Sequence, residues 1–287
     1  MDALRIGIFD SGVGGLSVLT AVRAAMPGAA LHYIADSGHA PYGERDRTHV
    51  LARSHAIASH LVAAGADAIV IACNTATAAA GESLRAAWPN IPIIGVEPGI
   101  KPAVLASRNG RIGIMATRAT LESSRFERLL DAHRGGAAIF LQACTGLAAA
   151  IESGQLDDPA LHALIAHHCR PLIAACVDTV VLGCTHYSFA RESIQAVMGH
   201  KVEIIDTASA VARQVATVCR DLAPSSIETQ SGGSTELQTT GDVALLRRIA
   251  RDWLGFDGDV SAWPNSFDLV PRTGIEPVRP LSRSGGF

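Results

Sequence analysis

The sequence is short of aromatic side chains and has no block of like charge. Phe, Trp and Tyr make up 5% of the 287 residues, and acidic and basic residues are interspersed at a net charge of −3. Few aromatics argue against a stacking platform for single-stranded nucleic acid, and the even charge distribution argues against a nucleic-acid or acidic-membrane partner. We therefore expect a small-molecule ligand, with no nucleic acid and no membrane among the partners.

Sequence signals for export, membrane insertion and metal binding are also lacking. The N-terminus has no basic segment followed by a long apolar core, and Asp67 and Asp178 interrupt the longest apolar stretches, at 61–80 and 172–184. The six cysteines include no C-x-x-C pair and no spacing with His that suits zinc or thioredoxin-type redox chemistry. These features predict a cytoplasmic protein with reduced thiols, no transmembrane segment and no metal.

Runs of β-branched residues alternate with amphipathic stretches along the chain. Residues 5–9, 31–35 and 68–72 have the pattern of strands, and residues 15–26 and 48–64 have that of helices. This alternation predicts an α/β fold with mostly parallel sheets. With 48% apolar residues, the chain is long enough to form two lobes.

A weak internal repeat divides the chain into two similar halves. RIGI at 5–8 returns at 111–114, DAIVIAC at 67–73 returns as DTVVLGC at 178–184, and PII at 92–94 returns as EII at 203–205. The last two matches share one offset of 111 residues, which favours duplication over a chance likeness of buried strands. We expect two pseudo-symmetric α/β lobes with the active site in the cleft between them, because such sheets bind ligands beyond the carboxyl ends of their strands.

After residue 206 the sequence pattern changes from alternating strands and helices to helices separated by polar or irregular segments. Residues 207–222 have a helical pattern, residues 224–236 are rich in Ser, Thr and Gly and predict a loop, and residues 242–254 predict an amphipathic helix. From 263 to 287 the sequence is irregular and contains several prolines. We expect a disordered tail without a functional role there.

Cys73 and Cys184 end the repeated strands, so the two thiols should face each other across the cleft. Inverting a carbon centre by proton transfer requires removal of a proton from one face and delivery to the other, which two acid/base groups can do. A thiol, with an ordinary pKa near 8.5, can serve in either protonation state. A lone cysteine at a strand end is more often inert packing, but the pairing favours catalysis. Cys169 and Cys176, spaced by seven in a helical stretch, are interpreted as packing.

Polar residues cluster at the same strand-to-helix junctions. They are Asp10 and Ser11, Asn74 and Thr75, and Thr185 and His186. Helix N-termini bind anions there, so a substrate with two carboxylates is expected, although simple helix capping would also explain Ser11, Asn74, Thr75 and Thr185. Asp10 and His186, one beside each thiol, are the candidates to orient or deprotonate the cysteines.

Two alternatives of other classes are open at this point. The glycine-rich loop DSGVGGLS at 10–17, with Asp36 after a second strand, invites a dinucleotide-binding interpretation. However, Ser17 replaces the third glycine of that motif, and Asp10 would bring a carboxylate towards the pyrophosphate. The second alternative is a two-lobed protein that closes on a dicarboxylate without chemistry.

Six motifs resemble the glutamate racemase family over most of the chain, up to about Gly255. They are FDSGVGGLSV at 9–18, APYG at 40–43, ACNTA at 72–76, GVEPG at 95–99, GCTHY at 183–187 and TTGD at 239–242. The resemblance implies a cofactor-independent racemase that interconverts L- and D-glutamate and supplies D-glutamate for peptidoglycan biosynthesis. Aspartate racemases and related Cys/Cys isomerases share this architecture and stay open as alternatives. A homodimer is left open as well.

The resemblance also implies roles for individual residues. Cys73 is expected to act on D-glutamate and Cys184 on L-glutamate, with Asp10 and His186 assisting. The implied substrate-binding residues are Asp10, Ser11, Tyr42, Gly43, Asn74, Thr75, Thr185 and His186, with Thr117 and Glu152 as further candidates. Ser188 follows GCTHY where the family usually has proline, a departure that leaves the reacting groups intact.

The division into lobes is implied in the same way. The first lobe is expected to comprise residues 1–97 and 207–262 and to carry Asp10 and Cys73. The second is expected to comprise residues 98–206 and to carry Cys184 and His186.

Overall fold

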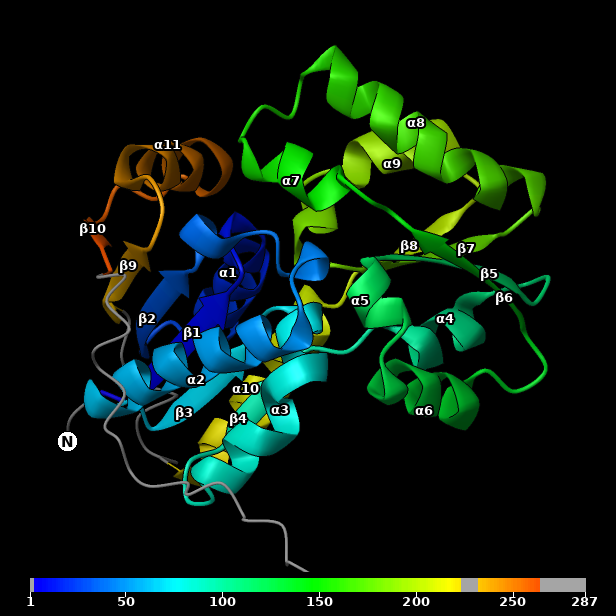
Figure 1. Ribbon diagram of the computed structural model, residues 1–287. Coiled ribbons are helices and arrows are strands. Elements are labelled where there is room, and N and C mark those ends of the chain that lie inside the picture. The colour runs from blue at the N-terminus through cyan, green and yellow to red at the C-terminus, as the bar shows by residue number, and fades with distance from the viewer. Residues whose placement is uncertain (1–2, 223–231, 264–287) are drawn as a thin grey trace, which may run out of the picture.

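The chain folds around two β-sheets, one in each lobe, as the computed structural model in Figure 1 shows. The structure describes residues 3–222 and 232–263. The first sheet has the strand order β10 (Val260–Ala262), β9 (Thr235–Thr239), β2 (Ala30–Ala35), β1 (Arg5–Asp10), β3 (Ala68–Ile71) and β4 (Ile93–Gly95). The second has the order β6 (Ala138–Ala143), β5 (Arg111–Ala116), β7 (Thr179–Gly183) and β8 (Glu203–Ile205). Each of these strand pairings is parallel, which confirms the predicted fold class.

Helices cover both faces of each sheet, so each lobe is a three-layer structure with its core between sheet and helices (Figure 1). In the first lobe one face holds α1 (Leu16–Ala25), α10 (Ala208–Leu222) and α11 (Val243–Leu254), and the other holds α2 (Arg47–Ala63) and α3 (Asn74–Ala87). In the second lobe one face holds α7 (Leu147–Glu152), α8 (Pro159–Ala174) and α9 (Arg191–Met198), and the other holds α4 (Ile100–Ala106) and α6 (Ser124–His133).

Short helical elements follow several strands at their carboxyl ends. They are η1 (Val13–Gly15), η2 (Ser37–His39), η3 (Tyr42–Glu44), α5 (Arg118–Leu121) and η4 (Thr185–Ser188). Among the described residues, no helix combines the length and apolar character needed to cross a bilayer.

Local sequence signals start and stop the helices. Asp46 caps α2 by accepting a hydrogen bond from the His49 N–H at 2.8 Å, and Asp242 caps α11 by accepting one from the Ala244 N–H at 2.7 Å. Gly255 ends α11 with a φ of 62°, a left-handed conformation that glycine adopts without strain. The predicted helix at 242–254 is therefore confirmed to within one residue.

The two sheets have the relationship that the internal repeat predicts. The order β2-β1-β3-β4 in the first sheet matches β6-β5-β7-β8 in the second. Ile69 pairs with Ile93, and Val180 pairs with Ile204, so the same offset of 111 residues relates both partners of the two pairs. The carboxyl ends of β3 and β7 therefore occupy equivalent places. The lobe boundaries at 97/98 and 206/207 stay predictions.

The structure corrects the C-terminal part of the sequence interpretation. The loop predicted at 224–236 ends too late, because Thr235 and Glu236 belong to β9, which pairs with β2. Its polar composition hid this strand, in which only Leu237 and Thr239 are buried. Trp263, the first residue of the predicted tail, is only 6% exposed and belongs to the first-lobe core. Residues 223–231 and the rest of the tail lie outside the described residues.

The interpretation of two cysteines as packing is correct for only one of them. Cys169 lies on α8 and is buried in the second-lobe core. Cys176 lies beyond the end of α8, is exposed, and has a φ of 52°. The spacing of seven residues suggested one helical face, but the helix ends before the second cysteine.

A buried ion pair fixes the loops around the carboxyl end of β2. Arg53 on α2 donates to both carboxylate oxygens of Asp36, at 2.9 and 2.7 Å. The hydroxyls of Tyr42 and Thr240 donate to the same carboxylate, at 2.5 and 2.8 Å. Because Gly43 follows Tyr42 directly, this network also holds the loop that reaches the second lobe.

We expect Arg53→Met to lower the free energy of unfolding by about 3–5 kcal/mol, because it leaves the Asp36 charge buried without its counter-ion. Urea denaturation followed by circular dichroism measures the loss. Arg128→Met is the control, since Arg128 and Glu82 form an exposed pair whose removal should cost less than about 1 kcal/mol. Similar losses in the two variants would contradict the assignment.

Candidate active site

A small cavity lies between loops of the two lobes. It has a volume of about 130 Å³ and is lined by Pro41, Gly43 and Glu44 from the first lobe and by second-lobe residues that include Thr117 and Cys144. Of the residues predicted from the sequence, Gly43 and Thr117 line this cavity. At the same ends of the sheets, Asp10 ends β1, Cys73 follows β3 and Cys184 follows β7. Ligands of parallel α/β sheets bind at this edge. Contacts between the lobes, such as the hydrogen bond from Thr185 to Asp10, bring residues at these strand ends together.

The first thiol, Cys73, is buried at the start of α3. Its Sγ accepts a hydrogen bond from the Ala76 N–H at 3.4 Å and so caps the helix. Burial raises the pKa of Cys73, and the Asp10 carboxylate raises it further, against the smaller lowering effects of the Ala76 N–H and the Ser11 hydroxyl. Cys73 is therefore favoured in its protonated form, as a proton donor.

Asn74 has a buried side chain that no described residue satisfies. The interpretation of Asn74 and Thr75 as helix caps is wrong, because Cys73 occupies the capping position of α3. Asn74 is only 5% exposed. Its Nδ2 and its Oδ1 both lack a hydrogen-bond partner among the described residues. Buried amides are nearly always hydrogen-bonded, so Asn74 fits a ligand that offers both a donor and an acceptor.

Asp10 is completely buried close to Cys73. Its Oδ2 accepts a hydrogen bond from the Gly12 N–H at 3.0 Å, and its Oδ1 accepts one from the Thr185 hydroxyl of the second lobe at 3.2 Å. Burial raises the pKa of Asp10 and outweighs the lowering effect of a charged His186. A carboxyl group with a raised pKa beside a thiol is suited to exchange protons with it.

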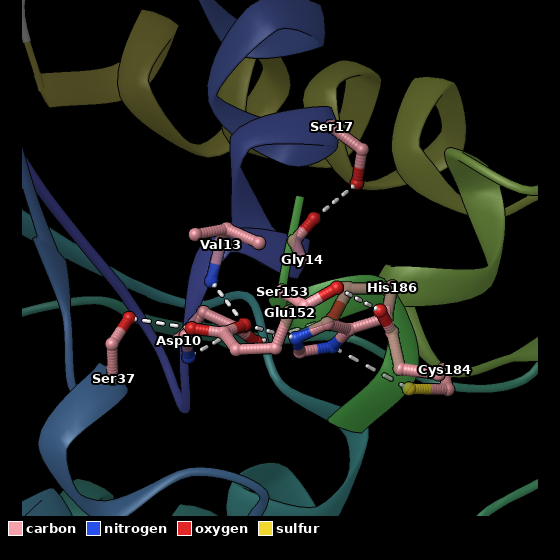
Figure 2. Close-up of polar contacts among 12 residues, drawn as sticks. Asp10, Val13, Gly14, Ser17, Ser37, Glu152, Ser153, Cys184 and His186 are labelled. Carbon is pink, nitrogen blue, oxygen red and sulfur yellow. Dashed lines mark hydrogen bonds and ion pairs between the residues drawn. The ribbon is translucent and has the colours of Figure 1, made fainter. Parts of the chain in front are cut away.

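The second thiol, Cys184, lies in a different electrostatic setting. Its Sγ is 3.8 Å from His186 Nδ1, and His186 Nε2 is 2.6 Å from Glu152 Oε2 (Figure 2). Burial lowers the pKa of His186, but the hydrogen bonds to Cys184 and Glu152 outweigh it, so the pKa lies well above its usual value. A protonated His186 therefore places a positive charge beside the Cys184 sulfur, whereas Cys73 has a carboxylate beside it.

Three threonine hydroxyls meet where the lobes touch. Thr75 Oγ1 lies 3.0 Å from Thr117 Oγ1 and 3.3 Å from Thr120 Oγ1, and the last two are 2.9 Å apart. Thr117 also caps α5. Thr120 is not among the residues predicted from the sequence. Its position three residues after Thr117, at a helix start, is the only signal that could have indicated it.

Tyr42 and Gly43 have structural tasks at the first-lobe side of the cavity. The Tyr42 hydroxyl donates to Asp36, so this side chain completes the buried ion pair. Gly43 lies so close to Thr117 that a Cβ at position 43 would be 2.6 Å from the Thr117 Cβ. Only glycine lets the first-lobe loop approach the second lobe this closely.

Two contacts of Glu152 were not predictable from motifs. Its Oε1 accepts a hydrogen bond from the Ser37 hydroxyl at 2.6 Å, and its Oε2 accepts one from the Val13 N–H at 2.8 Å. Ser37 lies outside the six family-like motifs, and Val13 contributes only its backbone. No pattern in the sequence marks either group.

The chain is similar in sequence and fold to known proteins along most of its length. A profile of the Asp/Glu/hydantoin racemase family matches residues 16–215. The glutamate racemase of Ectopseudomonas mendocina is 42% identical over 255 residues, which cover 89% of this chain and 96% of that protein.

Solved structures show the same likeness. A glutamate racemase isoform of Bacillus anthracis superimposes with a TM-score of 0.83 at 31% identity, covering 91% of this chain and 98% of that one. The glutamate racemase of Escherichia coli, solved with L-glutamate and the activator UDP-MurNAc-Ala, gives a TM-score of 0.81 at 26% identity over the same shares of the two chains.

Proposed function

The chain belongs to the Asp/Glu/hydantoin racemase family, and we propose that it is a glutamate racemase whose two thiols move the Cα proton between opposite faces of the substrate. It is an isomerase, and its similarity to proteins named glutamate racemases supports glutamate as the substrate. The observation that carries the two-thiol mechanism is the equivalent placement of Cys73 and Cys184 at the ends of β3 and β7, where the two thiols are close enough to interact electrostatically.

The electrostatic settings of the two thiols suit opposite roles in the same turnover. With L-glutamate, the Cys184 thiolate, supported by His186, removes the Cα proton, and the Cys73 thiol donates its proton to the other face of the planar carbanion. With D-glutamate the two thiols exchange roles, and Asp10 takes up or returns the proton that Cys73 must lose. His186 lies 3.8 Å from the Cys184 sulfur, and the Asp10 carboxylate is close enough to Cys73 to raise the pKa of that thiol.

The remaining polar groups are proposed to hold the substrate. Asn74 supplies an unused donor and acceptor, and the hydroxyls of Ser11, Thr75, Thr117 and Thr185 lie around the same strand ends. Hydroxyls and amides at helix starts suit the two carboxylates of glutamate. We further propose that the product D-glutamate serves peptidoglycan synthesis and that the enzyme works in the cytoplasm, where thiols stay reduced.

Optical activity provides the direct test. Purified protein incubated with L- or D-glutamate, without added pyridoxal phosphate, flavin or metal, should bring the circular dichroism signal of either enantiomer to zero. In deuterated water the Cα hydrogen should exchange at the same time. Binding of glutamate without loss of optical activity would favour a non-catalytic binding protein. Loss of optical activity with aspartate but not with glutamate would assign the enzyme to the other substrate.

A further inference from the structure

Glu152 is one of the points at which the first lobe contacts the groups around the second thiol. Glu152 ends α7 in the second lobe, yet two of its three hydrogen-bond donors come from the first lobe, namely the Ser37 hydroxyl at 2.6 Å and the Val13 N–H at 2.8 Å. The third donor is His186 at 2.6 Å. Figure 2 shows the Glu152 side chain lying between Val13 and Ser37 on one side and His186 on the other.

The chain of contacts continues from Glu152 to the sulfur atom. His186 bonds to Glu152 through Nε2 and lies 3.8 Å from Cys184 Sγ through Nδ1. The His186 side chain is only 2% exposed, so water cannot replace a lost partner without a rearrangement. The position of the Glu152 carboxylate therefore decides how the imidazole is aimed at Cys184.

The backbone of the first lobe is shaped to receive this carboxylate. A Cβ at Gly12 would lie 2.5 Å from the Glu152 Cδ, so no other residue could stand there without displacing it. On one side of the Glu152 carboxylate, Gly12 leaves the space that it occupies and the Val13 N–H donates to it. On the other side, the hydroxyl of Ser37, at the start of η2, donates to it.

We propose that Ser37 and the Val13 N–H are positioning groups of the first lobe, which hold Glu152 and thereby align His186 with Cys184. The second thiol then has its complete set of neighbours only while the two lobes touch. Separation of the lobes leaves Glu152 with His186 as its remaining donor and free to rotate. This inference rests on the proposed racemase function and adds to it a coupling between lobe contact and the chemistry of one of the two thiols.

Isotope effects on the two enantiomers separate this role from a merely structural one. Ser37→Ala removes a hydrogen bond to a charged group, and we expect kcat/KM to fall about tenfold. Because the enantiomers have equal free energies in water, kcat/KM must fall equally in both directions. The step at Cys184 becomes slower relative to that at Cys73, so the Cα-deuterium isotope effect on kcat/KM should rise with L-glutamate and fall with D-glutamate.

Two further variants complete the experiment. Ser37→Thr keeps a hydroxyl that can donate to Glu152 and should restore most of the rate and the wild-type isotope effects. Ser17→Ala is the matched control, because the Ser17 hydroxyl donates to the Gly14 carbonyl at 2.8 Å in the same region and makes no contact with Glu152. It should match the wild type in both measurements.

The outcomes distinguish this inference from the proposed function. If the wild type racemises glutamate and Ser37→Ala leaves the isotope effects unchanged or shifts them in the opposite sense, the inference is overturned. A wild type that does not racemise glutamate overturns the proposed function instead. Thermal unfolding of Ser37→Ala near the wild-type midpoint shows that the fold is kept, and if that variant does not fold, the isotope effects of Glu152→Asp, with its shorter side chain, decide in the same way.

Discussion

Replacing either Cys73 or Cys184 by alanine is expected to lower the rate of glutamate racemisation by at least about 10³-fold. With one thiol left, a proton can be taken from one face of Cα and returned to that face, but no group delivers it to the other. Circular dichroism of L- and D-glutamate measures the loss. Proton NMR in deuterated water should still detect slow Cα exchange in the enantiomer that the remaining thiol faces, without inversion.

The control for these variants is a thiol of similar burial outside the site. Cys169→Ala removes a buried sulfur from the second-lobe core, and Cys219→Ala removes one from the first-lobe core. Both should racemise glutamate near the wild-type rate at a temperature where they stay folded, although each loses some stability from the cavity left behind. Near-normal turnover in Cys73→Ala or Cys184→Ala would show that the pair is misassigned.

The sequence predicts the thiols and their neighbours because these residues lie at strand ends. Buried parallel strands are readable from runs such as those of β3 and β7, and the residue after each run must lie at the carboxyl edge of its sheet. The repeat then relates the two edges. What lies within a few residues of a strand end, such as Asp10 or His186, is therefore predictable from local pattern alone.

Contacts between the lobes are not predictable in this way. Ser37 and Glu152 are separated by 115 residues, and their hydrogen bond depends on how two separately folded sheets are oriented. The capping of α3 shows a similar limit at short range. Asn74 and Thr75 are better caps than cysteine by intrinsic preference, but the helix starts one residue earlier, and Cys73 takes the role.

The glycine-rich loop shows why a motif needs its structural context. Read along the sequence, the loop at 10–17 resembles part of a dinucleotide-binding motif. In the structure Gly12 leaves room for Glu152, and Gly14 leaves room for His186, both from the second lobe. The glycines permit one lobe to approach the other, and they do so at the groups that serve Cys184.

Gly14→Ala is expected to lower kcat/KM for glutamate by about 10²-fold, since displacement of a catalytic group by about 1 Å can cost that much. A Cβ at position 14 would lie 2.7 Å from the backbone nitrogen of His186 and closer still to its Nδ1, so η4 must move. Glutamate racemisation measured by circular dichroism, alongside thermal unfolding, shows whether activity falls further than stability does.

Gly136→Ala is the matched control for this prediction. Gly136 has no atom within 4 Å of the position that a Cβ would occupy, so the same substitution there should leave the rate near that of the wild type. If Gly14→Ala retained activity within about threefold of Gly136→Ala, His186 would have to tolerate a shift against Cys184. The alignment of imidazole and sulfur would then not limit the rate. His186 lies close to Gly14 through both its ring and its backbone nitrogen. A large loss of activity in Gly14→Ala but not in Gly136→Ala would therefore show that the first-lobe loop maintains the alignment of the imidazole with the Cys184 sulfur.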